Sequence, residues 1–338
     1  MERINYFDFL KGIAIILVVM GHIAEKSMGI TSSLFNNLYG SFHMPIFITI
    51  SGFLCFKHSD FTISDLLNFI HKKFLRVILP FLSVGALYGY WNFNNPTDGM
   101  INKFQGLWFL PTLFYCMIVS YITLYFIKKI SNNTYIIISS LAAIWIISVL
   151  IYMSYSPSIP YYLNYIRMFP YFIFGVILSH KKNWYDFILS NKIIFTLSII
   201  LYTLILTLSG KNILSFINFN IAGFFAIAIL FQLCSNTSNH VLYQKIKEIG
   251  IYSIEIYLFH WFLLPSLPMI GKWLTYNNPI NEMTINNNNL IILFIFSLAI
   301  SIPIIISCIY IAQFIRKSSI LAFLILGIPI KKINSHNK

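Results

Sequence analysis

Charged residues are scarce in this sequence. Asp, Glu, Lys and Arg make up 10% of its 338 residues, and 58% of the residues are hydrophobic. Soluble globular domains carry about 25% charged residues, so the deficit excludes an ordinary soluble fold. The apolar stretches 13–19, 136–151, 193–208 and 290–311 are nearly continuous and lack the alternation of a transmembrane β-barrel. The composition predicts an all-α protein, a polytopic bundle of transmembrane helices.

Acidic residues and cysteine motifs are also rare. The sequence has 10 Asp and Glu against 23 Lys and Arg, a formal net charge of +13. The basic residues lie in separate short loops, which is typical of membrane topology, so we expect no nucleic-acid partner. The four cysteines form no CxxC pair. We therefore expect neither a disulfide nor a bound metal.

Apolar windows of about 20 residues predict ten transmembrane helices. Their expected ranges are 7–25, 41–56, 75–92, 107–127, 134–153, 163–179, 193–209, 213–234, 249–265 and 290–312. All but five of the 23 Lys and Arg then fall on one side of the membrane, the exceptions being Lys26, Lys103, Arg167, Lys211 and Lys272. Because basic residues favour cytoplasmic loops, we expect both termini in the cytoplasm.

The sequence suggests one transmembrane domain over residues 1–315 and a short cytoplasmic tail over residues 316–338. Residues 320–330 are apolar but too few to cross a bilayer, so we expect an interfacial segment against the inner leaflet. The first helix shows no signal-peptide cleavage site and is expected to stay as an anchor. The composition, rich in Ile, Asn and Lys, suggests a bacterial genome, so we expect a multi-pass protein of a bacterial inner membrane.

The first predicted helix carries three ionisable residues, which are costly at membrane depth. Lys11 and His22 are eleven residues apart, which at about 100° per residue brings them within about 20° of the same helix face and about 16 Å apart along the axis. Asp8 and Lys11 are spaced to form an ion pair. His22 has no such local partner, and the plainer interpretation of this residue is a neutral histidine that bonds across helices.

The second helix places His43 near its outer end, as the first does His22, so two antiparallel helices bring the histidines to similar depth. The basic group Lys72, Lys73 and Arg76 precedes the third helix. Positive-inside bias explains the two lysines adequately. Arg76 lies slightly deeper and has the geometry to bind a phosphate group.

Several further residues are weaker candidates. Arg167 can be an interfacial arginine, and Trp108 can belong to the aromatic belt. In the ninth helix Gly250, Ser253, Tyr257 and His260 share one stripe, and the plainer interpretation of His260 is a structural bond between helices.

These motifs, taken in order, resemble the acyltransferase 3 family of integral-membrane O-acyltransferases. The segments are RINYFDFLKGIAIILVVMGH, FHMPIFITISGFL, Lys73 with FLRVILP, GLWFLP, RMFPYFIFG and GIYSIEIYLFH. Lys11, ten residues and then His22 are similar to the family's motif of a basic residue, ten residues and a histidine. The resemblance implies that Lys11 and His22 are functional. It also implies transfer of an acyl group, commonly acetyl from acetyl-CoA, to hydroxyls of extracytoplasmic sugars.

That resemblance assigns roles to the candidates. We expect acetyl-CoA, the donor substrate, to be held at the inner mouth through its phosphates by Lys11 and Arg76 with Lys73, while Asp8 fixes Lys11 or Arg3. We expect His22 to act as general base. His43 can orient His22, donate to the thioester oxyanion or bind the sugar. We expect the acceptor, a glycan of the cell envelope or a lipid-linked glycan, to be bound from the outer side by Arg167, Trp108, Tyr39 and His260.

Two questions stay open at the level of sequence. Some family members carry an extracellular hydrolase-like domain that completes the transfer, and none is visible in this sequence. We therefore expect either direct transfer within the membrane domain or hand-off to a separate protein. The alternative function is a proton-coupled or lipid-linked-sugar transporter, since such carriers also place Lys and His in membrane helices. The absence of an inverted repeat and the concentration of ionisable residues in the first three helices favour the transferase.

Overall fold

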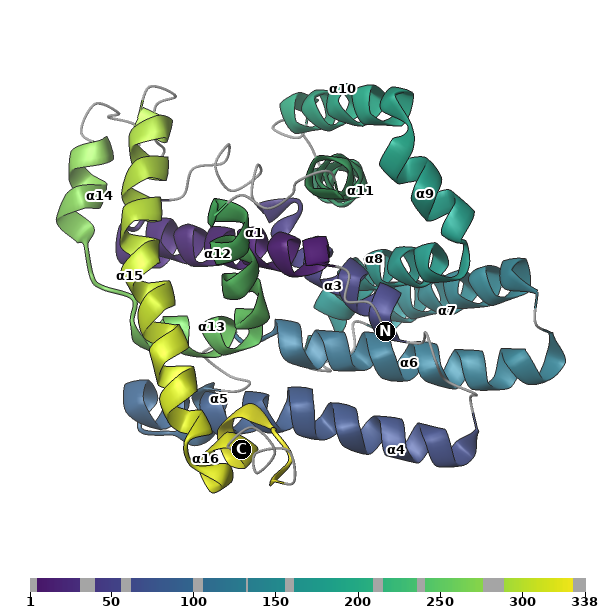
Figure 1. Ribbon diagram of the computed structural model, residues 1–338, viewed down its shortest axis with the longest axis horizontal. Coiled ribbons are helices and arrows are strands. Elements are labelled where there is room, and N and C mark those ends of the chain that lie inside the picture. The colour runs from purple at the N-terminus through teal and green to yellow at the C-terminus, as the bar shows by residue number, and fades with distance from the viewer. Residues whose placement is uncertain are drawn as a thin grey trace. The chain divides into compact units, whose positions relative to one another are not determined.

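The computed structural model describes residues 5–30, 40–55, 62–99, 106–131, 133–155, 161–208, 215–235, 241–275 and 289–330. All regular elements within these ranges are helices (Figure 1). An apolar chain in a bilayer has to satisfy its backbone hydrogen bonds internally, and helices do so within one segment.

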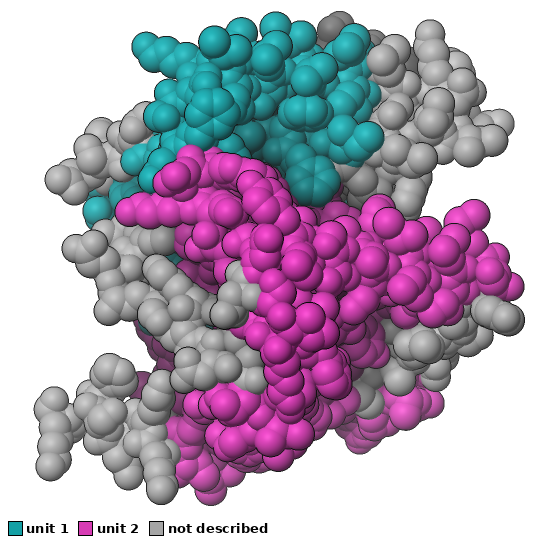
Figure 2. Space-filling view, turned by 90° about the vertical axis from the view of Figure 1, so that its right-hand side faces the viewer, with its two compact units in different colours: residues 1–47, 186–312 teal, residues 48–185, 313–338 magenta. Residues whose placement is uncertain are grey.

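The chain forms two compact units, coloured separately in Figure 2. Unit 1 comprises residues 1–47 and 186–312, and unit 2 comprises residues 48–185 and 313–338. Of the described helices, three contain a boundary between the units in their sequence: α3 (His43–Cys55), α9 (Lys182–Ser190) and α15 (Leu290–Arg316).

Unit 1 is built from helices of both the beginning and the end of the sequence. Besides its parts of α3, α9 and α15, it contains α1 (Asn5–His22), the π-helical turn η1 (Ile23–Ser27), α10 (Lys192–Leu208), α11 (Ser215–Ser235), α12 (Val241–Ile251), α13 (Ser253–Phe259), the 3₁₀ turn η4 (His260–Phe262) and α14 (Pro268–Thr275).

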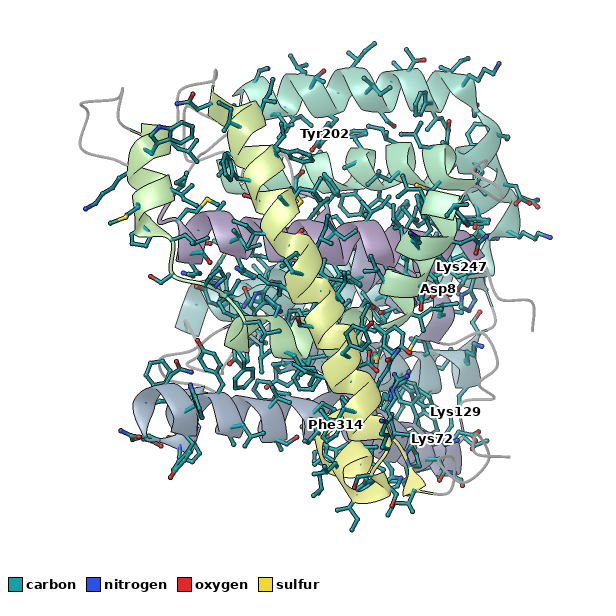
Figure 3. The ribbon with its side chains drawn as sticks, turned by 60° about the vertical axis from the view of Figure 1, so that its left-hand side comes forward. Asp8, Lys72, Lys129, Tyr202, Lys247 and Phe314 are labelled. Atoms are coloured by element: carbon teal, nitrogen blue, oxygen red, sulfur yellow. The ribbon has the colours of Figure 1, made fainter. Side chains whose placement is uncertain are left out.

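Helix α1 lies against α12 through two glycines. A Cβ atom on Gly12 would overlap the carbonyl oxygen of Ile246, and one on Gly250 would overlap that of Asp8. Small residues let helix backbones approach closely, which is the usual way in which helices associate inside a membrane. Asp8 and Lys247, labelled in Figure 3, come from these two helices. The glycine contact fixes α1, and with it Lys11 and His22, within unit 1.

Unit 2 contains the other helices. Besides the remainder of α3, α9 and α15, they are α4 (Ile63–Lys73), the π-helical turn η2 (Phe74–Ile78), α5 (Leu79–Phe93), the 3₁₀ turn η3 (Pro96–Gly99), α6 (Phe109–Ile130), α7 (Thr134–Tyr155), α8 (Tyr162–His180) and α16 (Ser319–Leu326). Glycines again allow close packing, since a Cβ on Gly52 would overlap the carbonyl oxygen of Phe172 and one on Gly175 that of Thr49.

The C-terminal apolar segment forms helix α16, which packs on α5 within unit 2. The hydroxyl of Ser83 donates to the carbonyl of Leu324 at 2.7 Å, and a guanidinium nitrogen of Arg76 donates to that of Leu326 at 3.3 Å. Gly327 ends the helix at a φ of 61°, a left-handed conformation that favours glycine. The domain boundary at residue 315 and the interfacial location of this segment stay predictions.

Each of the ten expected ranges contains a helix, but the ninth is not one piece. Over 249–265 the chain ends α12, turns at Tyr252, and continues through α13 and η4. Within the described residues, five helical stretches are long and apolar enough to cross a membrane: Tyr6–Ser27, Ile63–Phe93, Phe109–Ile130, Thr134–Ser154 and Leu290–Arg316. A sixth is possible if α9 and α10, which meet at 75°, form one broken span. A helical membrane bundle is thus supported, whereas the count of ten and the cytoplasmic termini stay predictions.

The bend between α9 and α10 is held by polar groups of unit 1. The side-chain oxygen of Asn191 accepts the backbone N–H of Ile193 at 2.8 Å and so caps the start of α10. The amide of Gln232, on α11, donates to the carbonyls of Ile188 and, at 2.9 Å, Asn191. These bonds satisfy backbone oxygens that the helix break would otherwise leave without a partner.

Candidate functional site

Helix α1 brings the first candidates onto one element. Its α-helical hydrogen bonding runs without interruption from Asn5 to His22, so the predicted phase between Lys11 and His22 applies to the folded chain. The predicted pairing of Asp8 with Lys11 is confirmed, since Lys11 Nζ lies 2.6 Å from Asp8 Oδ1. The Asp8 side chain is 5% exposed and that of Lys11 24% exposed. The pair therefore keeps a buried carboxylate neutralised by a cation that still reaches solvent.

His22 is the last residue of the α-helix α1, directly before the π-helical turn η1. The residues after it, Ile23–Ser27, form a π-helical turn, a rare conformation that is frequent at functional sites. His22 is half-buried, whereas its neighbours Gly21 and Ile23 are buried. Among the described residues, its Nδ1 atom is buried and has no hydrogen-bond partner.

The ring of His22 contacts two aromatic rings from the other end of the sequence. It stacks on His260 with ring centres 5.4 Å apart and planes at 17°, and its centre lies 4.3 Å from that of Trp261. His260 and Trp261 are themselves 5.1 Å apart. We call these three residues the imidazole cluster; all three belong to unit 1.

The turn at Tyr252 and the 3₁₀ turn η4 give His260 its place in this cluster. Helix α13 is short and largely buried, and the chain tightens into η4 at His260. His260 is fully buried, and its Nδ1 lies 2.9 Å from the carbonyl oxygen of Ile256. A carbonyl oxygen only accepts, so this nitrogen carries the proton and donates it.

The structure places His43 in unit 1 with the imidazole cluster. It is the first residue of α3, is half-buried, and lies within electrostatic range of His22. The expectation that two antiparallel helices bring these histidines to similar depth stays a prediction. The role of His43 stays a prediction.

The cationic candidates Lys73 and Arg76 lie in unit 2. Lys73 ends α4 and has its Nζ 5.3 Å from the ring centre of Phe69. Arg76 lies within the π-helical turn η2, is exposed, and donates one of its hydrogen bonds to Leu326. A guanidinium has five N–H donors, so this one bond leaves Arg76 capacity for a phosphate.

The predicted acceptor residues are placed as follows. Trp108 directly precedes α6 and is half-buried, and Arg167 is half-buried on α8, within electrostatic range of Tyr171. Both belong to unit 2. Tyr39 lies outside the described residues. Of the predicted site residues, Asp8, Lys11, His22, His43 and His260 thus share unit 1.

Trp261 is the residue that sequence reasoning missed. Its ring centre lies 4.3 Å from that of His22, closer than the ring centre of His260 at 5.4 Å. The signal available in the sequence is the dipeptide His260-Trp261, because large aromatic side chains bury much area and prefer to pack against other rings. The sequence alone, however, gave no reason to bring residue 261 to residue 22.

These features define a class: a helical membrane protein with an imidazole cluster inside one of its helical units. A family model described as "Acyltransferase domain" matches residues 4–308, nearly the whole chain. The chain therefore belongs to the acyltransferase 3 family, as its motifs predict.

One named relative is the nodulation protein NolL of Sinorhizobium fredii (strain NBRC 101917 / NGR234). It is 29% identical to this chain over 120 residues, which are 31% of this chain and 32% of NolL. The match thus spans about a third of the relative's length. No solved structure matches the chain significantly.

Proposed function

We propose that this protein is a membrane O-acyltransferase that moves an acyl group, by default acetyl, from cytoplasmic acyl-CoA to a hydroxyl of a cell-surface or lipid-linked glycan. Membership of the acyltransferase 3 family supports the class of reaction. The observation that carries the proposal is the ring of His22, which packs against His260 and Trp261 and keeps a buried nitrogen without a partner among the described residues.

The proposed reaction needs one base. A nitrogen of His22 with a free lone pair takes the proton of the acceptor hydroxyl, while the hydroxyl oxygen bonds to the thioester carbonyl carbon. The C–S bond then breaks, and the CoA thiolate leaves with the proton that His22 received. Imidazole suits this exchange because its ordinary pKa of about 6.5 lets it accept and return a proton near neutral pH. Trp261 and His260 would limit the access of water, which would otherwise hydrolyse the thioester.

The donor is proposed to enter from the cytoplasmic side. Lys11 and Arg76, with Lys73, would bind its phosphates, and Asp8 would orient Lys11 through their 2.6 Å ion pair. The helix places Lys11 and His22 about 16 Å apart along its axis, a distance that an extended pantetheine arm can cover. The acyl group would thus arrive at the imidazole ring.

The acceptor is proposed to bind from the outer side of the membrane. Arg167, Trp108 and Tyr39 are proposed to contact the glycan, and His43 to orient His22, to stabilise the thioester oxyanion or to bind the sugar. The localisation proposed is the inner membrane of a bacterium.

The proposed function is tested by measuring the transfer of labelled acetyl groups from acetyl-CoA to the glycan. Membranes that contain the full chain are incubated with acetyl-CoA labelled in the acetyl group and with glycan extracted from cells that lack the chain. A transferase releases free CoA and places alkali-labile label in the glycan. If the glycan stays unlabelled and no CoA is released in excess of control membranes, the proposal is wrong and transport becomes the leading function. If label is transferred, mass analysis of surface glycans from cells with and without the protein identifies the acceptor.

A further inference from the structure

The starting point is a polar atom that the local fold leaves without a partner. His260 is fully buried, and its Nε2 atom has no hydrogen-bond partner among the described residues. Leaving a buried polar group without a partner destabilises the folded state, so a group of this kind in a native fold calls for an explanation.

The other nitrogen of the same ring determines what Nε2 can bind. Because Nδ1 donates its proton to the carbonyl of Ile256 at 2.9 Å, Nε2 of the neutral ring carries a lone pair and can only accept. The bond to Ile256 also fixes the ring plane, so the lone pair has a fixed direction. His260 is thus prepared to receive an O–H or N–H group.

The position of His260 next to His22 indicates which donor group binds to its Nε2 atom. Its ring stacks on His22, and Nδ1 of His22 is likewise buried and without a partner among the described residues. Under the proposed function, His22 accepts the hydrogen bond of the hydroxyl that becomes acylated. One hydroxyl has one hydrogen and cannot serve both rings. The second ring therefore needs a second donor.

We propose that the acceptor is a vicinal diol, whose one hydroxyl is deprotonated by His22 while the neighbouring hydroxyl donates a hydrogen bond to Nε2 of His260. With hydrogen bonds of about 2.8 Å on either side, two adjacent hydroxyls can reach two rings whose centres are 5.4 Å apart. His260 is then a substrate-binding residue that selects sugars with adjacent free hydroxyls. The inference rests on the proposed function.

Two substitutions separate the two nitrogens of the ring. His260→Asn keeps an amide near the position of Nδ1, which can still donate to Ile256, and removes the acceptor at Nε2. His260→Gln places its amide near the position of Nε2 and keeps an acceptor there. We expect His260→Asn to lower kcat/KM for the glycan at least tenfold, and His260→Gln to stay within about threefold of the parent. Acetyl-CoA affinity should be unchanged in both variants, which also shows that they fold.

His180 provides a matched control. Its Nδ1 lies 2.9 Å from the carbonyl of Val176, four residues earlier, as that of His260 does from Ile256, but it lies in unit 2 and outside the imidazole cluster. His180→Asn should leave transfer unchanged. If His260→Asn retains full activity, or if His260→Gln is as inactive as His260→Asn, Nε2 binds no acceptor hydroxyl and the inference is overturned.

The requirement for a vicinal diol is tested by modifying the acceptor glycan and leaving the protein unchanged. Periodate cleaves the carbon–carbon bond of vicinal diols, so extracted glycan is oxidised with periodate, freed of reagent and offered to the parent protein with labelled acetyl-CoA. We expect the label to fall at least tenfold relative to untreated glycan. Equal labelling of both preparations overturns the diol. Failure of the proposed function would look different, because the parent protein would then label neither preparation.

Discussion

At the scale of single residues, His22 is the group on which acyl transfer depends most. Positioned general bases contribute about 10²–10⁴-fold to a rate. We expect His22→Ala to lower the rate of label transfer by at least about 100-fold, with acetyl-CoA affinity unchanged. His71→Ala, which alters an exposed histidine on α4, is the control and should be fully active. Activity retained in His22→Ala would remove this imidazole from the mechanism.

Lys11 is expected to act on donor binding. Hydrogen bonds to charged groups contribute about 1.5–3 kcal/mol, so Lys11→Ala should weaken acetyl-CoA binding roughly tenfold or more. Titration of the purified full chain with acetyl-CoA measures the effect. Lys129→Ala is the matched control, since Lys129 is an exposed lysine whose Nζ donates to the Tyr125 hydroxyl at 2.7 Å. Unchanged affinity in Lys11→Ala would exclude the phosphate role.

Local spacing was a good guide for residues on one helix. The ion pair of Asp8 and Lys11 follows from their separation by three positions, and the shared face of Lys11 and His22 follows from helix geometry. The contact of Trp261 with His22 joins residues far apart in the sequence, and no local rule predicts it.

At the scale of helices, the contact of α1 with α12 depends on glycine. A Cβ on Gly250 would overlap the carbonyl of Asp8, so Gly250→Ala should push the two helices apart. Overpacking of this kind costs about 1–3 kcal/mol. We expect a lower Tm in detergent and weaker acetyl-CoA binding, since Lys11 lies on α1. Ile251→Ala, at the exposed next position, is the control and should change neither quantity strongly.

The break between α9 and α10 depends on Gln232. Gln232→Leu removes the donor to the carbonyls of Ile188 and Asn191, which leaves buried acceptors without a partner at a cost of about 1–3 kcal/mol. We expect a lower Tm and faster proteolysis near the bend. Asn92→Leu removes an exposed bond to the Tyr88 carbonyl and should be nearly neutral. Equal Tm values for the two variants would show that Gln232 does not hold the bend.

Apolar runs located the helices but not their breaks. The stretch 249–265 has the composition of one span, yet the chain turns at Tyr252 and tightens at His260. Composition reports how a segment partitions between water and lipid, and it does not report where packing interrupts the helix.

At the scale of the whole molecule, the distribution of Lys and Arg predicts a topology. Both termini are expected in the cytoplasm, and the loop before the last span outside, because basic residues resist translocation. A reporter that is active only in the cytoplasm should work when fused after residue 338 and fail when inserted at residue 286. The opposite pattern would reverse the orientation and move the proposed donor site to the wrong face.

The sequence by itself determined the class of protein, the approximate places of its helices and the family, because these depend on local hydrophobicity, helical phase and ordered motifs. Tertiary structure alone decided that His22 meets His260 and Trp261 and that glycines bring α1 onto α12. The reason is physical. A helix fixes the relation between residues a few turns apart, whereas contacts between distant segments depend on how whole helices pack against one another.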